Sequence, residues 1–347
     1  MSNSNLSGWY NLRRTKLESL YSMPTVLLSA PYVIYSLARF RPVLEHYGVE
    51  LIVPEVHERL SEDEILAYAG RFDGALCGDD YFSERVIRAC LPRLKVISKW
   101  GTGIDSIDRQ AAERMGVRVR NTPNAFTLPV ADSVLGYILT FARQLAAMDR
   151  VVKSGTWGKL PGRSLSECTL GVIGVGNIGK AVLRRAGAFG MRLLGNDIIE
   201  IAPDFLAENR VEMVSLRELL ERSDFISLNC DLNPSSRHLI NAETLNWVKP
   251  GAVLINTSRG PVVEEAALVN ALRSGRLSGA ALDVFEIEPL PADSPLRTMD
   301  NVMLAAHNAN SSPAAWERVH WNTLRNLLEG LGIPCEDLDE VRRRHPA

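Results

Sequence analysis

The stretch Thr169-Leu170-Gly171-Val172-Ile173-Gly174-Val175-Gly176-Asn177-Ile178-Gly179-Lys180 decides the fold of this 347-residue chain. Its first part, from Leu170 to Ile173, is short and apolar, which predicts a buried strand. Its second part begins a pattern in which apolar residues recur on one helical face, at Ile178, Val182, Ala186 and Phe189. The stretch therefore predicts a strand, a glycine-rich turn and a helix.

The three glycines of the turn form a GxGxxG motif. Gly174 permits a tight turn, Gly176 lets the backbone approach a pyrophosphate, and Gly179 allows the helix to pack closely on the strand. The start of the helix presents unpaired N–H groups and a partial positive charge to the phosphates. The motif indicates a dinucleotide site; the alternative is a turn that only joins a strand to a helix.

An acidic residue stands where this kind of site needs one. A second strand-like run, Met191 to Leu194, leads to Asp197, whose carboxylate can accept hydrogen bonds from the adenosine ribose. The same charge would repel a 2′-phosphate, and the next residues, Ile198 and Ile199, supply no arginine to bind one. The sequence therefore favours NAD over NADP.

The composition bounds the class of protein. A chain of 347 residues with 46% hydrophobic residues predicts two domains with substantial cores. The net charge of −2 gives no reason to expect a nucleic-acid or membrane partner, and no apolar run is long enough to span a bilayer. The N-terminal residues lack the apolar stretch of a signal peptide. The five cysteines are scattered, which favours a cytoplasmic protein with no metal site.

Strand and helix patterns alternate along the chain, which predicts an α/β fold with parallel sheets. We expect a long buried helix over Val130 to Met148, joining two domains, and a loop over Ser154 to Glu167. We expect the charged C-terminal tail to be solvated. Strands are predicted at Thr25–Ser29, Glu50–Val53, Gly74–Cys77, Lys95–Ser98, Val117–Arg120, Phe225–Leu228, Ala252–Asn256, Ala280–Val284 and Val302–Ala305.

Further motifs flank the glycine-rich turn. They are Gly101-Thr102-Gly103-Ile104-Asp105, Asn256-Thr257-Ser258-Arg259-Gly260, Leu282-Asp283-Val284-Phe285-Glu286-Ile287-Glu288-Pro289, and His307 after a strand. Their order and spacing resemble the D-2-hydroxyacid dehydrogenase family, which includes D-3-phosphoglycerate dehydrogenases. The resemblance covers about residues 25 to 330.

The resemblance implies two Rossmann-like or flavodoxin-like parallel-sheet domains with a cleft between them. The implied organisation is an N-terminal extension (1–23), a discontinuous substrate domain (24–125 plus 309–332), an NAD-binding Rossmann domain (126–308) and a C-terminal tail (333–347). It also implies a homodimer that binds a small 2-hydroxyacid or 2-keto acid.

The resemblance also implies roles for individual residues. His307 would be the catalytic acid–base, Glu288 its carboxylate partner, and Arg259 the clamp on the substrate carboxylate. Thr102 and Gly103 would belong to the loop that receives the same carboxylate. Contacts to NAD are expected at Gly174, Gly176, Asn177, Ile178, Gly179, Asp197, Cys230, Thr257 and Asp283.

The reduction of a 2-keto acid requires these residue types, independently of the resemblance. Reduction of a 2-keto acid needs a hydride and a proton, and histidine titrates near physiological pH. We expect Glu288 to stabilise the imidazolium and so to raise the pKa of His307. Arginine suits the carboxylate because its planar fork binds both oxygens and stays charged.

Simpler interpretations remain open for several residues. Arg259 could cap a strand end, and Glu288 could be a solvated loop acid. Lys99, beside the predicted substrate loop, could bind an anionic substrate group or only pack there. We expect surface or packing roles for His46, His57, His238, His320 and His345.

The sequence thus predicts an NAD-dependent oxidoreductase that interconverts a D-2-hydroxyacid and its 2-keto acid. D-3-phosphoglycerate is the first substrate suggested by the resemblance, and glycerate the next. The family commonly has a proline before the catalytic histidine, whereas Ala305 and Ala306 precede His307 here, so the substrate stays open. The alternative function is an NAD-sensing binding protein on the same fold, similar to the C-terminal-binding corepressors.

Overall fold

The computed structural model describes residues 23–346, so the predicted N-terminal extension lies almost entirely outside the described residues. The chain divides into two compact units. Unit 1 holds the residues up to Pro123 together with those from Glu317 onward, and unit 2 runs from Asn124 to Trp316. The predicted domain boundaries fall after residues 125 and 308. Both units contain a parallel sheet with helices, so the predicted α/β class is confirmed.

Unit 1 contains a five-stranded parallel sheet in the order β2-β1-β3-β4-β5. This is the flavodoxin-like order, in which the direction of winding reverses between β1 and β3. The strands are β1 (Thr25–Leu28), β2 (Glu50–Ile52), β3 (Gly74–Cys77), β4 (Val96–Lys99) and β5 (Arg118–Arg120). The helices are α2 (Pro31–Ile34), α3 (Leu37–His46), α4 (Glu62–Leu66), α5 (Glu84–Cys90), α6 (Arg109–Arg114), α14 (Pro313–Leu331) and α15 (Leu338–Arg344).

The part of α14 within unit 1 packs tightly on the sheet. A Cβ added to Gly330 would lie 2.3 Å from a Val96 methyl carbon, so only glycine permits this approach. The Ser98 hydroxyl donates to the Thr323 carbonyl at 2.8 Å, from β4 to α14. The C-terminal segment of the chain is thereby built into the core of unit 1.

The expectation of a solvated C-terminal tail is wrong. Residues 338–344 form α15, in which Leu338 and Val341 are buried. The carboxylate of Asp337 accepts a hydrogen bond from the Tyr47 hydroxyl at 2.7 Å. The many charged residues of this segment obscured the helical spacing of Leu338 and Val341 in the sequence. The burial of these two side chains holds α15 against the rest of unit 1.

Unit 2 contains a seven-stranded parallel sheet in the order β12-β11-β10-β9-β6-β7-β8. The winding reverses between β6 and β9, as in a dinucleotide-binding Rossmann sheet. The strands are β6 (Thr169–Ile173), β7 (Arg192–Asn196), β8 (Val211–Met213), β9 (Phe225–Leu228), β10 (Ala252–Asn256), β11 (Leu277–Leu282) and β12 (Val302–Leu304). The sequence patterns did not predict β8, and β11 begins three residues before its prediction.

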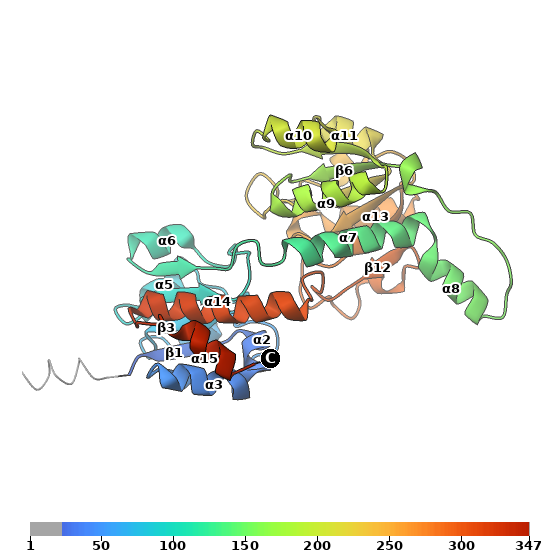
Figure 1. Cartoon of the computed structure of the whole chain (residues 1–347). Helices are drawn as coiled ribbons and strands as arrows, with labels where there is room; N and C mark the ends of the chain where they lie inside the picture. The colour runs from blue at the N-terminus through green and yellow to red at the C-terminus, as the bar shows by residue number, and fades with distance from the viewer. Residues whose placement is uncertain (1–22, 347) are drawn as a thin grey trace, which may run out of the picture. The chain divides into compact units, whose positions relative to one another are not determined.

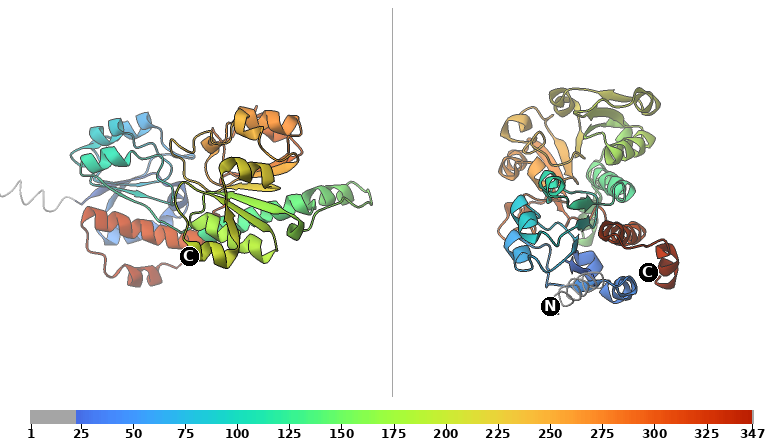
Figure 2. Two further views of the ribbon diagram at one scale, coloured as in Figure 1. Left: turned by 90° about the horizontal axis from the view of Figure 1, so that it is seen from above. Right: turned by 90° about the vertical axis from the view of Figure 1, so that its left-hand side faces the viewer.

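Helices cover both faces of this sheet (Figure 2). One buried cluster includes residues of α7, α9 and α10, and a second includes residues of α11, α12 and α13. The helices of unit 2 are α7 (Thr127–Ala142), α8 (Leu145–Lys153), α9 (Asn177–Ala188), α10 (Pro203–Asn209), α11 (Leu216–Arg222), α12 (Ala242–Leu245) and α13 (Glu265–Arg273), with short 3-10 turns at Leu165–Glu167, Gly260–Val262 and Pro295–Thr298.

The prediction of one helix over residues 130–148 that joins two domains is wrong. The structure has two helices there, both within unit 2. The break falls at Gln144, which has a left-handed backbone with φ of 56°. The returning chain supplies the reason, since the Arg163 N–H donates to the Ala142 carbonyl at 2.8 Å and occupies the end of α7.

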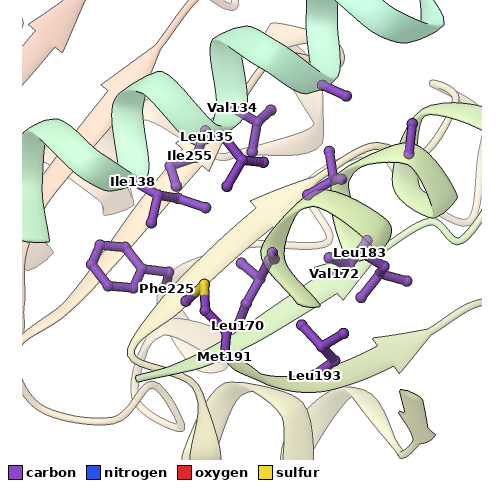
Figure 3. Packing of buried hydrophobic residues seen from close by; sticks show 14 of the residues in the cluster. Val134, Leu135, Ile138, Leu170, Val172, Leu183, Met191, Leu193, Phe225 and Ile255 are labelled. Carbon is purple, nitrogen blue, oxygen red and sulfur yellow. The ribbon is translucent and has the colours of Figure 1, made fainter. Parts of the chain in front are cut away.

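The buried face of α7 supports the sheet directly. Figure 3 shows Val134, Leu135 and Ile138 beside the strand residues Phe225 and Ile255. These side chains are nearly or fully buried, so α7 fixes the face of the sheet that also carries α9.

By contrast, α8 projects with its following loop away from the body of unit 2 (Figure 1). None of its residues is buried. The loop returns at Arg163, which donates to the buried carboxylate of Asp224 at 2.7 Å. Burial alone would raise the pKa of Asp224, but hydrogen bonds from Arg163, Lys249 and the Thr169 N–H lower it to about 2. This ionised group ties the base of the projection to the sheet.

Candidate active site

The glycine-rich turn lies at the carboxyl end of β6, where the winding of the unit 2 sheet reverses. Gly174 has φ of 88°, and a Cβ there would lie 2.5 Å from the Cys230 nitrogen at the end of β9. A Cβ on Gly179 would lie 2.0 Å from the Gly174 carbonyl oxygen. By contrast, a Cβ on Gly176 would meet nothing within 4 Å. Gly174 and Gly179 therefore serve packing, and Gly176 leaves open space before α9.

That open space fits a dinucleotide phosphate. Gly176 is exposed and precedes α9, a helix of 12 residues whose first N–H groups favour an anion. Asn177 is exposed, and its side-chain amide donates to Asn124 Oδ1. Ile178 instead packs against the buried cluster beneath the helix, so it anchors the turn from below.

Asp197 follows β7 and braces the same turn. Its Oδ2 accepts from the Val175 N–H at 2.6 Å, and its Oδ1 accepts from the Ile199 N–H at 3.2 Å. The carboxylate is thus fixed beside the glycines, with Ile198 and Ile199 exposed after it.

Two further predicted cofactor residues follow neighbouring strands. Cys230 follows β9, where burial raises the pKa of its thiol to about 11 and keeps the thiol neutral at pH 7. Thr257 follows β10, and its hydroxyl oxygen is buried without a hydrogen-bond partner among the described residues. Because buried hydroxyls normally have a partner, this atom suits a bound ligand.

Arg259 lies on the loop after β10. The Asn256 side chain donates to the Arg259 carbonyl at 3.0 Å, and Arg259 NH1 donates to the Ser258 carbonyl at 2.9 Å. A Cβ on Gly260 would lie 1.8 Å from the Phe285 carbonyl oxygen. Only glycine allows this contact, which fixes the Arg259 loop against the loop that carries Glu288.

Glu288 and His307 form a pair in unit 2. Glu288 Oε2 lies 3.3 Å from His307 Nδ1, and Glu288 Oε1 accepts from the Phe285 N–H at 3.0 Å. Both side chains are mostly buried, with exposed fractions of 20% and 27%. The carboxylate is thereby oriented before it meets the imidazole, as a partner of an acid–base histidine should be.

Asp283 holds the histidine loop in place. Its two oxygens accept from the backbone N–H groups of Asn308 and Ala309 at 2.7 to 3.1 Å, and its carbonyl accepts from the His307 N–H at 2.8 Å. Burial raises the pKa of Asp283, against the opposing effect of these hydrogen bonds. His307 itself has φ of 50°, an uncommon conformation for a residue with a side chain.

The structure adds a second histidine–glutamate pair that sequence reasoning missed. His238 Nε2 lies 2.5 Å from Glu286 Oε1, and Glu286 Oε2 accepts from the Glu265 N–H at the start of α13 at 3.2 Å. The position of Glu286, two residues before Glu288, was the available signal. This pair connects the Glu288 loop to two further segments.

In unit 1, the predicted substrate loop, which contains Thr102 and Gly103, follows β4. The Thr102 hydroxyl donates to the Thr122 carbonyl at 3.0 Å, and the Thr122 N–H donates to the Gly101 carbonyl at 2.8 Å. From α14, the Asn322 amide donates to the Thr122 hydroxyl at 3.0 Å. The loop is therefore braced, with Thr102 exposed and Gly103 half-buried.

Histidine 320 braces the residue before this loop. Its Nδ1 accepts from Trp100 Nε1 at 3.0 Å, and burial lowers the pKa of His320 to about 4. It is therefore neutral at pH 7, and the predicted packing role is the one that this geometry supports.

Comparisons with known proteins agree with this geometry. Residues 135–309 match the family model described as D-isomer specific 2-hydroxyacid dehydrogenase, NAD binding domain. A glyoxylate reductase of Korarchaeum cryptofilum is 41% identical over 68% of this chain and 73% of its own length. A D-3-phosphoglycerate dehydrogenase of Methanocaldococcus jannaschii is 42% identical over 64% of this chain and 43% of its own length.

Among solved structures, D-lactate dehydrogenase from Aquifex aeolicus, complexed with NAD and lactic acid, matches with a TM-score of 0.77 and 27% identity. The match covers 93% of this chain and 100% of that one. The chain belongs to the D-isomer specific 2-hydroxyacid dehydrogenase family. It is an NAD-dependent oxidoreductase that interconverts a D-2-hydroxyacid and its 2-keto acid by hydride transfer.

Two features are absent from residues 23–346. No helix in this part of the chain has the length and apolar character needed to cross a bilayer. No group of His, Cys, Asp and Glu side chains within it is arranged to hold a metal ion.

The glycines of the turn supply a matched pair of tests. Gly176→Ala adds a methyl group to open space, so we expect an unchanged melting temperature and about tenfold weaker NADH binding. Gly179→Ala forces a methyl group onto the Gly174 carbonyl, so we expect a loss of stability of about 1–3 kcal/mol. Thermal unfolding and NADH fluorescence titration measure both effects. Unweakened NADH binding in Gly176→Ala contradicts a phosphate site there.

Proposed function

We propose that the chain reduces small, unphosphorylated 2-keto acids, with glyoxylate and hydroxypyruvate as the leading candidates. The Glu288–His307 pair carries the proposal of proton transfer. The state of Lys99 supports the choice of substrate. Its ammonium is buried and lies 3.0 Å from Asp79 Oδ1, so the cation beside the predicted substrate loop is already neutralised. This favours glycerate over the phosphoglycerate that the resemblance suggested first.

The roles of the side chains follow from their contacts. His307 Nδ1 faces Glu288, so proton exchange with the substrate hydroxyl falls to Nε2. Glu288 stabilises the imidazolium and selects this ring orientation. Arg259 binds the substrate carboxylate in the bidentate manner of a guanidinium, and Thr102 and Gly103 bind it through their loop. This positioning holds the keto carbon for reaction.

NAD, when bound, accepts or donates the hydride at the substrate carbon. We assign its pyrophosphate to Gly174, Gly176, Asn177, Ile178 and Gly179, and its adenosine ribose to Asp197. Thr257 offers its unpartnered buried hydroxyl, and Cys230 offers a neutral thiol. Asp283 is assigned to the nicotinamide side, although the described contacts of its carboxylate are to the histidine loop.

The proposed activity is tested by following NADH oxidation with a panel of keto acids. The panel contains glyoxylate, hydroxypyruvate, pyruvate, phosphohydroxypyruvate and branched 2-keto acids. We expect turnover of glyoxylate or hydroxypyruvate, and we expect His307→Ala to lower kcat by about 10²- to 10⁴-fold because the proton donor is lost.

His46→Ala is the matched control, since His46 is an exposed histidine of α3 in unit 1. Its kinetics should equal those of the wild type. Tight NADH binding without turnover of any acid in the panel would contradict the proposal and favour the NAD-sensing alternative.

We further propose that the protein is a cytoplasmic homodimer in which a second copy of the chain covers the projecting α8 and its loop. Exposed apolar side chains gather there: Leu145, Val152 and Trp157 have exposed fractions of 53%, 46% and 91%. A cavity of about 450 Å³ adjoins this projection, lined in part by Phe141, Ala146, Pro161, Val302 and Met303. Large exposed apolar side chains that gather on one projecting segment are a feature of protein interfaces.

The cavity lies at the opposite edge of the sheet from the cofactor residues. It is lined at Phe225, Val253, Ser278 and Val302, close to the amino ends of four parallel strands, whereas Gly174 follows a carboxyl end. It therefore suits the proposed interface and leaves the chemistry to the other edge. The scattered free cysteines support the cytoplasmic location, which cell fractionation tests.

Trp157→Glu should shift the mass measured by light scattering from dimer to monomer, because it places a charge in the covered surface. Tyr35→Glu is the control, since Tyr35 is a similarly exposed aromatic residue on unit 1. An unchanged mass in Trp157→Glu contradicts this interface.

A further inference from the structure

The carboxyl edge of the unit 1 sheet holds a partly buried ion pair beside the place where its winding reverses. Asp79 follows β3, and Lys99 is the last residue of β4, paired in register with Cys77. Lys99 Nζ lies 3.0 Å from Asp79 Oδ1. Ligands of open parallel sheets bind at this edge, beside the reversal of winding. The pair is therefore placed to influence what binds to unit 1.

The pair is joined to the backbone of the proposed substrate loop. Besides its contact with Asp79, Lys99 Nζ donates to the Trp100 carbonyl at 3.0 Å. The Asp79 carboxylate thus lies within two hydrogen-bond lengths of the loop that continues to Thr102 and Gly103. Trp100 in turn stacks on Tyr32, with ring centroids 4.6 Å apart. The ammonium and the loop form one braced assembly.

The two members of the pair differ in exposure. The Lys99 side chain has an exposed fraction of 5%, whereas that of Asp79 is 37%. An incoming anion therefore meets the carboxylate before the ammonium. Asp105, farther along the same loop, is also exposed and acidic.

Several arginines lie on or near this sheet. Arg118 on edge strand β5 donates to the Glu329 and Gly330 carbonyls of α14, and Arg120 lies on the same side of the strand by alternation. Arg59, after β2, lies over the Tyr81 ring. The loop region thus presents the carboxylates of Asp79 and Asp105 to an incoming substrate.

We propose that Asp79 is a specificity residue, which neutralises Lys99 and excludes substrates that carry a second negative group beyond the reacting carboxylate. The inference rests on the proposed function and deepens it: the accepted class is the monoanionic 2-keto acids. A phosphate monoester carries a charge of about −1.5 to −2 at pH 7, so it meets strong repulsion from a nearby carboxylate.

The test compares phosphohydroxypyruvate with hydroxypyruvate, which differ only in the phosphate. The readout is the ratio of their kcat/KM values, so effects common to both substrates cancel. Asp79→Asn removes the exposed charge and releases the Lys99 ammonium, and we expect the ratio to rise about five- to tenfold. Asp79→Glu keeps the charge and should keep the wild-type ratio.

Glu113→Gln is the matched control, because Glu113 is an exposed acid of unit 1 on α6. It loses the same charge and should leave the ratio unchanged. A ratio in Asp79→Asn within twofold of the wild type overturns the proposal. So does a rise of equal size in Glu113→Gln, since the effect would then come from net charge alone.

A second measurement uses the wild-type protein and is independent of how any variant folds. Between about 20 and 200 mM KCl, salt screens exposed charges more strongly as the Debye length shortens. Repulsion by Asp79 predicts that the ratio rises with salt. A ratio that falls with salt indicates net attraction of the phosphate and overturns the proposal. Absence of hydroxypyruvate turnover at every salt concentration is a different result, because it contradicts the proposed function itself.

Discussion

The candidate active site of unit 2 depends on one short loop, residues 283–288, whose three carboxylates each hold a different segment. Asp283 binds the backbone that follows His307, Glu286 binds His238 and the start of α13, and Glu288 binds His307 itself. The carbonyl of Phe285 also packs against Gly260, directly after Arg259. Arg259 and His307 lie on loops that follow different strands. The acidic loop contacts both of these loops and so fixes their positions relative to each other.

Such a loop is costly to assemble, since carboxylates are taken out of water. Each accepts at least one hydrogen bond from a backbone N–H group, which stabilises its negative charge. The left-handed backbone at His307 is held in the same way, by two hydrogen bonds from its neighbours to Asp283. His307 is thus placed by backbone contacts, and its side chain faces Glu288.

Much of this could be predicted from the sequence, because the signals are local. The glycine spacing predicts a turn, and the apolar pattern predicts a buried strand. Both signals are local, so β6, α9 and the position of Asp197 could be predicted from them. The break between α7 and α8 could not be predicted this way. It depends on Arg163, 19 positions beyond Gln144, returning to bind the Ala142 carbonyl. The placement of α15 likewise depends on distant contacts that no local pattern records, since Arg39 of α3 donates to the His345 carbonyl and Tyr47 donates to Asp337.

The same distinction applies to the site. The motifs predicted Arg259, Glu288 and His307, and the structure links their loops within unit 2, while their roles in catalysis remain proposals. From the sequence, Lys99 could either bind a substrate anion or only pack beside the loop. Its ion pair with Asp79 is a three-dimensional contact that the sequence did not predict. The His238–Glu286 pair was missed because its members are 48 residues apart in the sequence.

We propose that His307 donates the proton to the reduced substrate while Glu288 stabilises the charged imidazolium. The most direct measurement is the pH dependence of kcat/KM for keto acid reduction, in the wild type and in Glu288→Gln. We expect that removing the carboxylate moves the alkaline loss of activity to lower pH by about one unit, since the imidazolium loses a favourable charge 3.3 Å away. An identical pH profile in both proteins would contradict it.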